Sequence, residues 1–218
     1  MGREINLLDS LPQIKRNIAQ RESGVPRGRE VAMKFGREYF DGDRTQGYGG
    51  YRYDGRWVGV ARRMREYYGL QPGARILDIG CAKGFFMHDF LGVLGRATVV
   101  GLEISSYAIE NSLQTVQGRM FRGTADHLPF PDKSFDLVVA INAIHNLPLD
   151  RCRRSLSEIE RVGRAHKYVQ VDSWLSDEQR RNFERWVLTA QTYFEPDGWR
   201  RLFSEAGYTG DYFWTLTE

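Results

Sequence analysis

The sequence predicts an α/β fold in which a doubly wound, mostly parallel sheet carries helices on both faces. Three observations predict it. Short β-rich runs alternate with helical patterns from residue 75 onward, the order typical of such a sheet. The run at residues 135–141 is almost continuously apolar, as expected for a central parallel strand covered on both faces. The first run, residues 75–79, leads directly into a glycine turn.

The elements follow one another in the order that this fold requires. We expect strands at residues 75–79, 98–102, 119–122, 135–141, 168–171 and 208–216. We expect helices at residues 84–94, 105–116 (with Ser105 as N-cap), 150–162, 177–190 and 197–206. Ligands of open α/β sheets bind at the carboxyl ends of the strands, where the strand order reverses. The loops after these strands are therefore the expected place for a site.

Residues 1–70 form an N-terminal helical and loop extension ahead of a domain at residues 71–218. We expect helices at residues 10–20 and 56–69, the second because its apolar side chains recur at helical spacing. Residues 40–57, between them, are rich in Gly, Tyr, Arg and Asp and have no clean period. They predict an ordered loop.

Composition excludes several classes of protein. The 218 residues are 41% hydrophobic and 27% charged, which is globular rather than disordered. The apolar runs are too short to span a bilayer, and the first twenty residues show no signal-peptide stretch. Cys81 and Cys152 are too few for a disulfide framework or a zinc site. We therefore expect a cytoplasmic protein with no metal and no membrane contact.

The charge of the chain gives no reason to expect a nucleic-acid partner. The formal net charge is +3, and the basic and acidic residues are interspersed. A nucleic-acid-binding surface would need a basic patch or stripe. We therefore expect a small molecule as the partner.

The strongest local signal is a strand that runs into a turn containing Gly80 and Gly84, followed at once by a helix. Glycines at these places let a ligand approach the backbone. Asp78 precedes the turn and Ala82 takes its middle place, so the dinucleotide pattern G-x-G-x-x-G is absent. Glu103 ends the next strand, where a carboxylate accepts hydrogen bonds from ribose hydroxyls. Together they predict a nucleoside ligand, although Glu103 alone could equally cap the following helix.

Residues 71–172 resemble the class I S-adenosylmethionine-dependent methyltransferases of the small-molecule type (methyltransferase type 11-like), which have a Rossmann-like fold. The family's first motif, an acid followed by G-x-G-x-G, is matched by Asp78, Gly80 and Gly84, with Ala82 in place of the central glycine. The resemblance implies S-adenosylmethionine as methyl donor and S-adenosylhomocysteine as product. It also implies that Glu103 binds the ribose and that Ile104 flanks the adenine.

Cys81, inside the same turn, is expected to pack under the cofactor as a small residue. A nucleophilic role is disfavoured because no His or acid is placed by the local sequence to activate its thiol.

Residues 123–136 resemble a second family motif, G-D-A-x-x-L-P-F-x-D-x-S-F-D. The family's adenine-binding Asp falls on Thr124, whose hydroxyl can still accept one weaker hydrogen bond. Asp126 is an alternative acceptor, and Ala125 is expected to offer its backbone N–H to the ring. Asn142, just past the strand at residues 135–141, is expected to hold the amino group of the donor.

His145 and Asp172 are the candidate catalytic residues because each follows a strand at the expected active edge of the sheet. Transfer from a sulfonium depends mainly on proximity and alignment, and a base is needed only when the acceptor carries a proton. His145 could deprotonate an acceptor hydroxyl near neutral pH, and Asp172 could bind an acceptor amine or hydroxyl. Alternatively, His145 only holds its loop and Asp172 caps a helix or turn.

Aromatic and charged residues of the extension predict contacts with the acceptor. Aromatic faces beside charged groups suit a sugar, an amino sugar or a nucleotide-sugar, and loops carry many binding residues. We therefore expect the extension to act as a lid, or else as a rigid loop with its aromatics in the core. The candidate substrate-binding residues are Tyr48, Tyr51, Tyr53, Arg56, Trp57 and Tyr193.

Three other functions stay open. An RNA or protein methyltransferase would need a basic stripe and an added binding module. A non-catalytic S-adenosylmethionine-binding partner subunit is kept open by Thr124. A nicotinamide-dependent dehydrogenase fails at Ala82 and leaves residues 123–136 unexplained.

The end of the chain departs from the family pattern. After Gly207 only one strand's worth of residues remains, whereas the family's sheet usually ends in a reversed hairpin. An uncovered edge strand invites pairing. We therefore expect a partner chain, in a homodimer, or the N-terminal segment to cover this edge.

Overall fold

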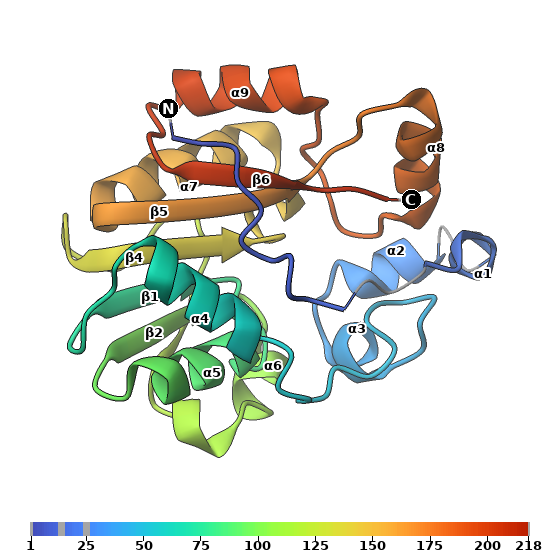
Figure 1. Ribbon diagram of the computed structural model, residues 1–218. Helices are drawn as coiled ribbons and strands as arrows, with labels where there is room; N and C mark the ends of the chain where they lie inside the picture. Colours follow the sequence, from blue (N-terminus) through green and yellow to red (C-terminus); the bar gives the residue numbers. More distant parts are fainter. Residues whose placement is uncertain (1, 13–15, 24–26, 218) are drawn as a thin grey trace.

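The computed structural model describes residues 2–12, 16–23 and 27–217 (Figure 1). Its centre is a six-stranded sheet in the order β3-β2-β1-β4-β5-β6, and every neighbouring pair is parallel. The doubly wound α/β fold predicted from the sequence is thereby confirmed, and the sheet is parallel throughout. The order reverses between β1 and β4, which is where such sheets bind ligands.

The strands lie close to their predicted positions. β1 and β4 begin and end where the sequence predicts, and β5 begins earlier because Gly163 pairs with Phe135 directly after the preceding helix. β6 is shorter than expected. The strands are β1 (Arg75–Ile79), β2 (Thr98–Glu103), β3 (Met120–Arg122), β4 (Phe135–Ile141), β5 (Gly163–Asp172) and β6 (Asp211–Thr215).

The helices of the domain are also close to expectation, with two shortened. The helix expected over residues 105–116 ends at Glu110 and a separate 3-10 turn follows, because Leu113 is extended. The helix expected over residues 177–190 ends at Trp186, because Val187 is extended. The helices are α5 (Phe85–Leu94), α6 (Ser106–Glu110), η1 (Gln114–Val116), η2 (Ile144–Asn146), α7 (Leu149–Val162), α8 (Asp177–Trp186) and α9 (Pro196–Glu205).

The extension differs more from its prediction. Residues 10–12, 16 and 17 are not helical, so the helix expected over 10–20 is wrong for them; residues 13–15 lie outside the described residues. A short helix begins at Ile18 instead, because the Asn17 side chain caps the backbone N–H of Gln20. The loop predicted at 40–57 starts two residues later than expected, since α3 ends at Asp41. The helices are α1 (Ile18–Glu22), α2 (Arg27–Ala32), α3 (Arg37–Asp41) and α4 (Val58–Tyr67).

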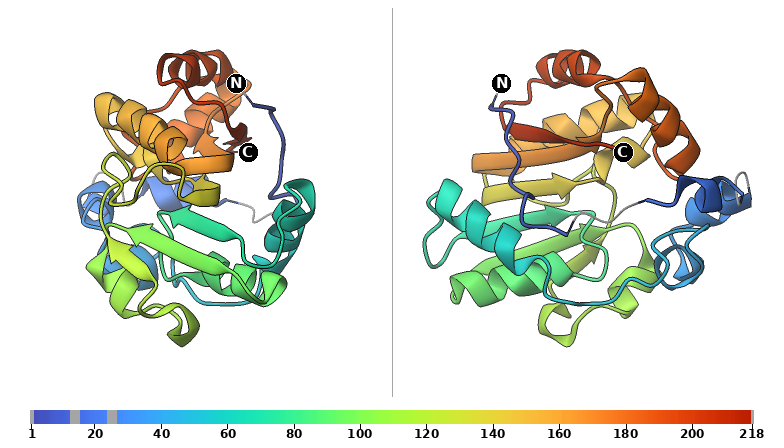
Figure 2. Two further views of the ribbon diagram at one scale, coloured as in Figure 1. Left: turned by 90° about the vertical axis from the view of Figure 1, so that its left-hand side faces the viewer. Right: turned by 45° about the vertical axis from the view of Figure 1, so that its right-hand side comes forward.

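Helices cover both faces of the sheet (Figures 1 and 2). On one face, Ile159 of α7 and Trp199 of α9 pack with Leu77 of β1. On the other, Met64 of α4 and Phe90 of α5 share a core. Leu7 and Leu8 belong to this second core, so part of the extension folds with the sheet. None of the helices in the described part of the chain is long and apolar enough to cross a membrane.

The N-terminal segment covers the outer edge of β6. Ile5 donates its backbone N–H to the carbonyl of Tyr212 at 2.9 Å, and Tyr212 donates to the carbonyl of Arg3 at 3.0 Å. Of the two covers expected for this edge, the segment of the same chain is the one that the structure contains. A partner chain is not needed to pair β6, and the homodimer stays a prediction.

Candidate functional site

A cavity lies at the carboxyl ends of β1, β2 and β4, where the strand order reverses. Its empty volume, with the open solvent at its mouth included, is about 710 Å³. The turns after the strands form the floor, and the extension forms the roof (Figure 1). The floor residues include Gly80, Ala82, Glu103, Ile104, Thr124, Ala125, Asn142, Asn146 and Leu147, and the roof residues are Phe35, Tyr39, Phe40 and Tyr48.

The turn after β1 is bent so that its backbone meets Glu103. Gly80 and Ala82 both have positive φ, +75° and +50°. Ala82 donates its N–H to Oε2 of Glu103 at 2.8 Å, and Ser105 donates to Oε1 at 2.9 Å. Burial raises the pKa of Glu103, and these backbone hydrogen bonds oppose that rise. Each carboxylate oxygen keeps a further lone pair, so Glu103 is a fixed acceptor on the cavity wall.

Asp78 lies beneath the turn. It sits in β1 between Gly101 of β2 and Val139 of β4, is 5% exposed and does not belong to the cavity lining. Burial, together with the nearby charge of Glu103, raises its pKa to about 8. Asp78 therefore shapes the site from below.

We expect Asp78 to make the free energy of unfolding depend on pH. The Asp78 pKa is about 8 in the folded chain against a reference of 3.8. The folded state thus keeps a proton that the unfolded state loses. The stability contributed by this proton is complete below pH 3.8 and is lost as the pH rises through 8.

Urea unfolding of the wild-type chain and of Asp78→Asn at several pH values checks this. The unfolding free energy of the wild type should fall relative to the variant by up to about 1.4 kcal/mol per pH unit between the two pKa values. Other titrating groups affect both proteins alike. Parallel curves for the two proteins would contradict the expectation.

Cys81 and Gly84 support the turn without lining the cavity. Cys81 is buried and unpaired, burial raises the pKa of its thiol, and it packs in the same core as Phe86. Gly84 caps α5 with a left-handed φ of +74°. Cys81 is thus a buried packing residue, and contact of Cys81 and Gly84 with the cofactor stays a prediction.

The turn after β3 carries three residues predicted to contact the adenine, and only two of them line the cavity. Thr124 and Ala125 line the cavity, as expected. Asp126 does not: its two oxygens accept from Nε and Nη2 of Arg151, both at 2.8 Å. The bonds from Arg151 hold its pKa well below the usual range, with help from the Thr124 hydroxyl. Asp126 as an alternative adenine acceptor is therefore wrong, because α7 holds its carboxylate.

Two asparagines stand at the end of β4. Asn142 lines the cavity with a positive φ of +50°, and its Oδ1 accepts from the Thr215 hydroxyl at 2.8 Å. Asn146 also lines the cavity, and its Oδ1 is buried with no hydrogen-bond partner among the described residues. Asn146 was not predicted as a cavity residue. The feature of the sequence that points to it is its place in the same loop as Asn142, four residues later.

His145 is buried and its ring is held by Asp172. It is 3% exposed and lies outside the cavity lining. Its Nδ1 accepts the backbone N–H of Asp172 at 3.2 Å, so the hydrogen-bond network assigns the proton to Nε2, which lies 3.4 Å from Oδ2 of Asp172. Burial lowers its pKa, and Asp172 opposes the change. His145 and Asp172 therefore contact each other beside the cavity, and their catalytic role stays a prediction.

The alternative, that His145 holds its loop, fits the structure. Its carbonyl accepts from the backbone N–H groups of Gln191 and Thr192, at 2.9 and 3.0 Å. The ring and the carbonyl together join the loops after β4 and β5 to the segment between α8 and α9.

Of the six predicted acceptor-binding residues, Tyr48 alone lines the cavity. Tyr51 stacks on Phe85 with ring centroids 4.7 Å apart. Tyr53 donates to Oδ1 of Asp89 at 2.6 Å and faces a groove between α4 and α5. Neither belongs to the cavity lining: Tyr53 lies against α5, whereas Tyr51 packs behind the roof on Phe40 and Tyr48.

The other three residues are also engaged elsewhere, so their predicted cavity contact is wrong. Arg56 forms an ion pair with Asp54 at 2.6 Å. Trp57 packs on Phe86, and Tyr193 packs with Trp174 and Phe183. The roof is formed instead by Phe35, Tyr39 and Phe40 together with Tyr48. The sequence analysis missed the first three, because no periodic pattern marked them.

Asp41 fastens this roof to the floor. It accepts from Nζ of Lys83, in the turn after β1, at 2.6 and 2.8 Å. It also accepts from the hydroxyl of Tyr107, in α6, at 2.6 Å. Lys83 is 7% exposed, whereas Asp41 reaches solvent, so only the lysine end of the pair is removed from water. Burial raises the pKa of Asp41, but the bonds from Lys83 and Tyr107 lower it overall.

Asp41→Asn should loosen the roof. The variant leaves the Lys83 ammonium buried without its carboxylate, which costs about 1.5 kcal/mol for a charge-assisted hydrogen bond and is equivalent to about tenfold in a rate or affinity. We expect bound S-adenosylhomocysteine to leave about tenfold faster, measured by stopped-flow fluorescence. Asp54→Asn, which breaks an exposed pair outside the cavity, is the matched control. Equal release rates for Asp41→Asn and wild type would refute the role of this contact.

Comparison with known proteins identifies the central part of the chain. Residues 77–169 match the family model described as a methyltransferase domain. A sterol 24-C-methyltransferase of Gibberella zeae is 33% identical over 119 residues, which cover 49% of this chain and 29% of that protein. A fatty-acid O-methyltransferase of Mycolicibacterium smegmatis is 34% identical over 99 residues, which cover 44% of this chain and 35% of that protein. The chain spans about a third of the length of these curated relatives.

A solved structure shares the fold. The YcgJ protein of Bacillus subtilis superposes with a TM-score of 0.53 at 22% identity, covering 69% of this chain and 67% of that one. Among the described residues, no three His, Cys, Asp or Glu side chains are grouped to hold a metal ion.

The cavity residues fit S-adenosylmethionine. Glu103 presents free lone pairs for the ribose hydroxyls. Ile104 and Ala125 offer apolar contact for an adenine ring, and the Thr124 hydroxyl stands beside them as a hydrogen-bond acceptor. The unpartnered Oδ1 of Asn146 suits the donor's ammonium group. The family model thus identifies residues 77–169, which carry the floor of this cavity, as a methyltransferase domain.

Proposed function

We propose that this chain transfers the methyl group of S-adenosylmethionine to a small-molecule acceptor held under the aromatic roof. The observation that carries the proposal is the cavity itself, whose floor carries Glu103 and whose roof carries Tyr39 and Tyr48. When bound, S-adenosylmethionine supplies a methyl carbon already activated by the sulfonium. The chain then has to position the acceptor and exclude water, and such positioning contributes roughly 7–11 kcal/mol.

The chemistry of the lining favours an uncharged or amine acceptor. Glu103 is the single charged residue among those that line the cavity. A nucleotide-sugar would bring phosphates with no cation to meet them there, since Arg56 is paired with Asp54. His145 and Asp172 lie outside the cavity, and an amine with a free lone pair needs no base. Of the predicted classes, an amino sugar therefore fits best, with its ring against the aromatic roof.

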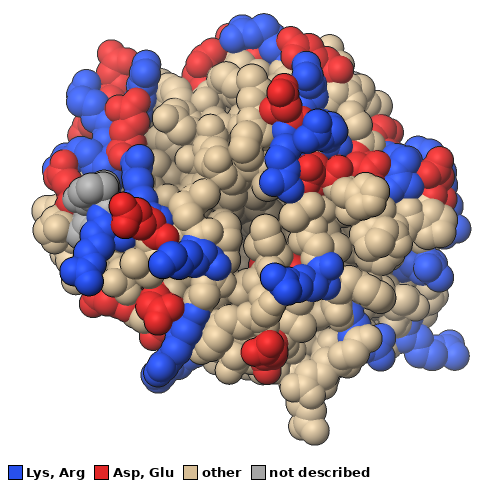
Figure 3. All heavy atoms as spheres, turned by 180° about the vertical axis from the view of Figure 1, so that it is seen from behind, with Lys and Arg blue, Asp and Glu red and all other residues tan. Residues whose placement is uncertain are grey.

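A lipid-like acceptor is the second candidate. Phe35, Phe40 and Leu147 give the cavity apolar walls. Figure 3 shows a hollow walled mostly by uncharged residues, with Lys, Arg, Asp and Glu at its margins. Two relatives are named for a sterol and a fatty acid as acceptors, which supports an apolar molecule here.

The cytoplasm is the proposed compartment. Cys81 and Cys152 are both buried and unpaired in the structure. Free thiols fit a reducing compartment.

A methyl-transfer assay tests the proposed function. The purified chain is incubated with S-adenosylmethionine and separate pools of amino sugars, neutral sugars, fatty acids, sterols and transfer RNA, and S-adenosylhomocysteine is quantified by mass spectrometry. We expect turnover that depends on the amino-sugar pool and is lost in Glu103→Ala. Donor binding without turnover on any pool would favour the non-catalytic subunit, and turnover on transfer RNA alone would overturn the small-molecule proposal.

A further inference from the structure

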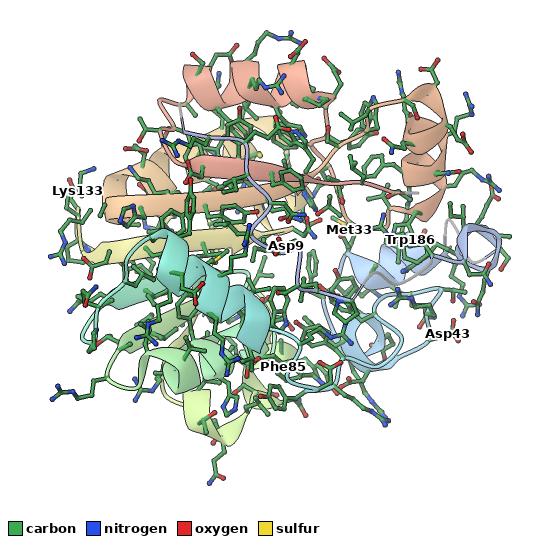
Figure 4. All side chains as sticks on the ribbon, in the orientation of Figure 1. Asp9, Met33, Asp43, Phe85, Lys133 and Trp186 are labelled. Atoms are coloured by element: carbon green, nitrogen blue, oxygen red, sulfur yellow. The ribbon has the colours of Figure 1, made fainter. Side chains whose placement is uncertain are left out.

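Three arginines from separate segments surround one indole ring. Trp186 ends α8, where α8 meets the extension (Figure 4). The Cζ atom of Arg21, in α1, lies 4.3 Å from its ring centroid. Those of Arg44, after α3, and Arg16, before α1, lie 5.3 and 5.4 Å from it. We call Arg16, Arg21, Arg44 and Trp186 the arginine cluster.

The charge of Arg21 is buried without a counter-ion. Its side chain is 5% exposed, and neither Arg21 nor Arg44 forms an ion pair with a carboxylate in the described ranges. Arg21 donates Nη2–H to the carbonyl of Gly47 at 3.0 Å, whereas its Nε and Nη1 are buried with no acceptor among the described residues. Burial, with the nearby positive charge of Arg44, lowers its pKa to about 10.

Asp43, whose negative charge acts to raise the Arg21 pKa, and Glu22 both have other hydrogen-bond partners. Asp43 accepts from the backbone N–H and the hydroxyl of Thr45, at 2.8 and 2.7 Å. Glu22 forms an ion pair with Arg185 at 2.6 Å. The indole face offers some cation–π attraction, but it accepts no hydrogen bond from an in-plane N–H. The cluster therefore concentrates positive charge and unfilled donors in one place.

We propose that the arginine cluster is a binding site for a phosphate-type oxyanion, outside the methyl-donor cavity. Guanidinium groups suit phosphate because several N–H donors meet several oxygens at once. Arg16 and Arg44 are only partly buried, so they form the side from which an anion enters. Inorganic phosphate and the phosphate of a phosphorylated small molecule share this chemistry.

An anion at this site would stiffen the roof of the cavity. Arg21 donates to the carbonyl of Gly47, and Arg44 donates to the carbonyl of Tyr48. Tyr48 lines the cavity. Anion binding thus joins α1, α8 and the roof loop through the same two guanidinium groups.

Thermal unfolding of the full chain with increasing sodium phosphate, at constant ionic strength, tests the proposal. We expect a saturable rise in Tm of about 3–5 °C once phosphate reaches about ten times its dissociation constant. Arg21→Gln and Arg44→Gln should each lose most of this rise. If Arg21→Gln fails to fold, Arg21→Lys and Arg44→Gln keep the test, because lysine retains the charge but not the planar fork.

Arg185→Gln is the matched control, since it removes one positive charge beside Trp186 that Glu22 already neutralises; it should keep the full rise. An equal rise in Arg44→Gln and wild type, or no rise in wild type, would overturn the proposal. A parallel titration with glucose 6-phosphate distinguishes the sources of the anion. Tighter binding than inorganic phosphate would support a phosphorylated ligand, and equal binding would support a free anion.

Discussion

Glu103→Ala is expected to weaken S-adenosylhomocysteine binding about 100-fold, as two charge-assisted hydrogen bonds to the ribose at about 1.5 kcal/mol each are lost. The carboxylate is fixed on the cavity wall by the N–H groups of Ala82 and Ser105. It therefore meets the ligand already oriented, without ordering a side chain on binding. Isothermal titration calorimetry of the two proteins measures the ratio of dissociation constants.

Two further variants make this prediction specific. Glu103→Gln keeps the shape but not the charge, and it should lose about tenfold. Glu66→Ala, at the exposed end of α4, removes a carboxylate from another surface and should bind like the wild type. A dissociation constant for folded Glu103→Ala within twofold of the wild type would show that the ribose does not bind here.

Gly80→Ala is expected to destabilise the chain by about 2–5 kcal/mol, from left-handed backbone strain of about 1–2 kcal/mol and overpacking of about 1–3 kcal/mol. Gly80 has a φ of +75°, and a Cβ atom added there would lie 2.5 Å from the Cβ of Ala143. Such a distance forces the turn after β1 away from the loop after β4. Because both line the cavity, donor affinity should fall as well.

A double-mutant cycle with Ala143→Gly separates the two causes of this loss. Removing the Ala143 methyl group relieves the collision but leaves the backbone strain. Gly80→Ala should therefore cost about 1–3 kcal/mol less in the Ala143→Gly background, measured by urea unfolding. Strictly additive effects would mean that the two positions do not collide, and that strain alone accounts for the loss.

The sequence by itself determined the fold class and most of the donor site. The apolar run of β4 and the turn after β1 are local signals, since burial on both faces and positive φ restrict the residue types that can stand there. Glu103, Thr124 and Ala125 follow strands directly, and parallel strands bring their carboxyl ends to one edge. Their place on the cavity wall was therefore predictable without coordinates.

Only the tertiary structure decided which side chains reach the cavity from elsewhere. Tyr53 and Tyr39 look alike in sequence, but Tyr53 bonds to Asp89 of α5, whereas Tyr39 forms part of the cavity roof. The ring of His145 is held by Asp172 and its carbonyl by residues 191 and 192, which lie far along the chain. The edge of β6 is paired by Arg3 and Ile5, from the opposite end of the sequence. Such contacts depend on the path of the chain through space, which a local pattern of residues does not encode.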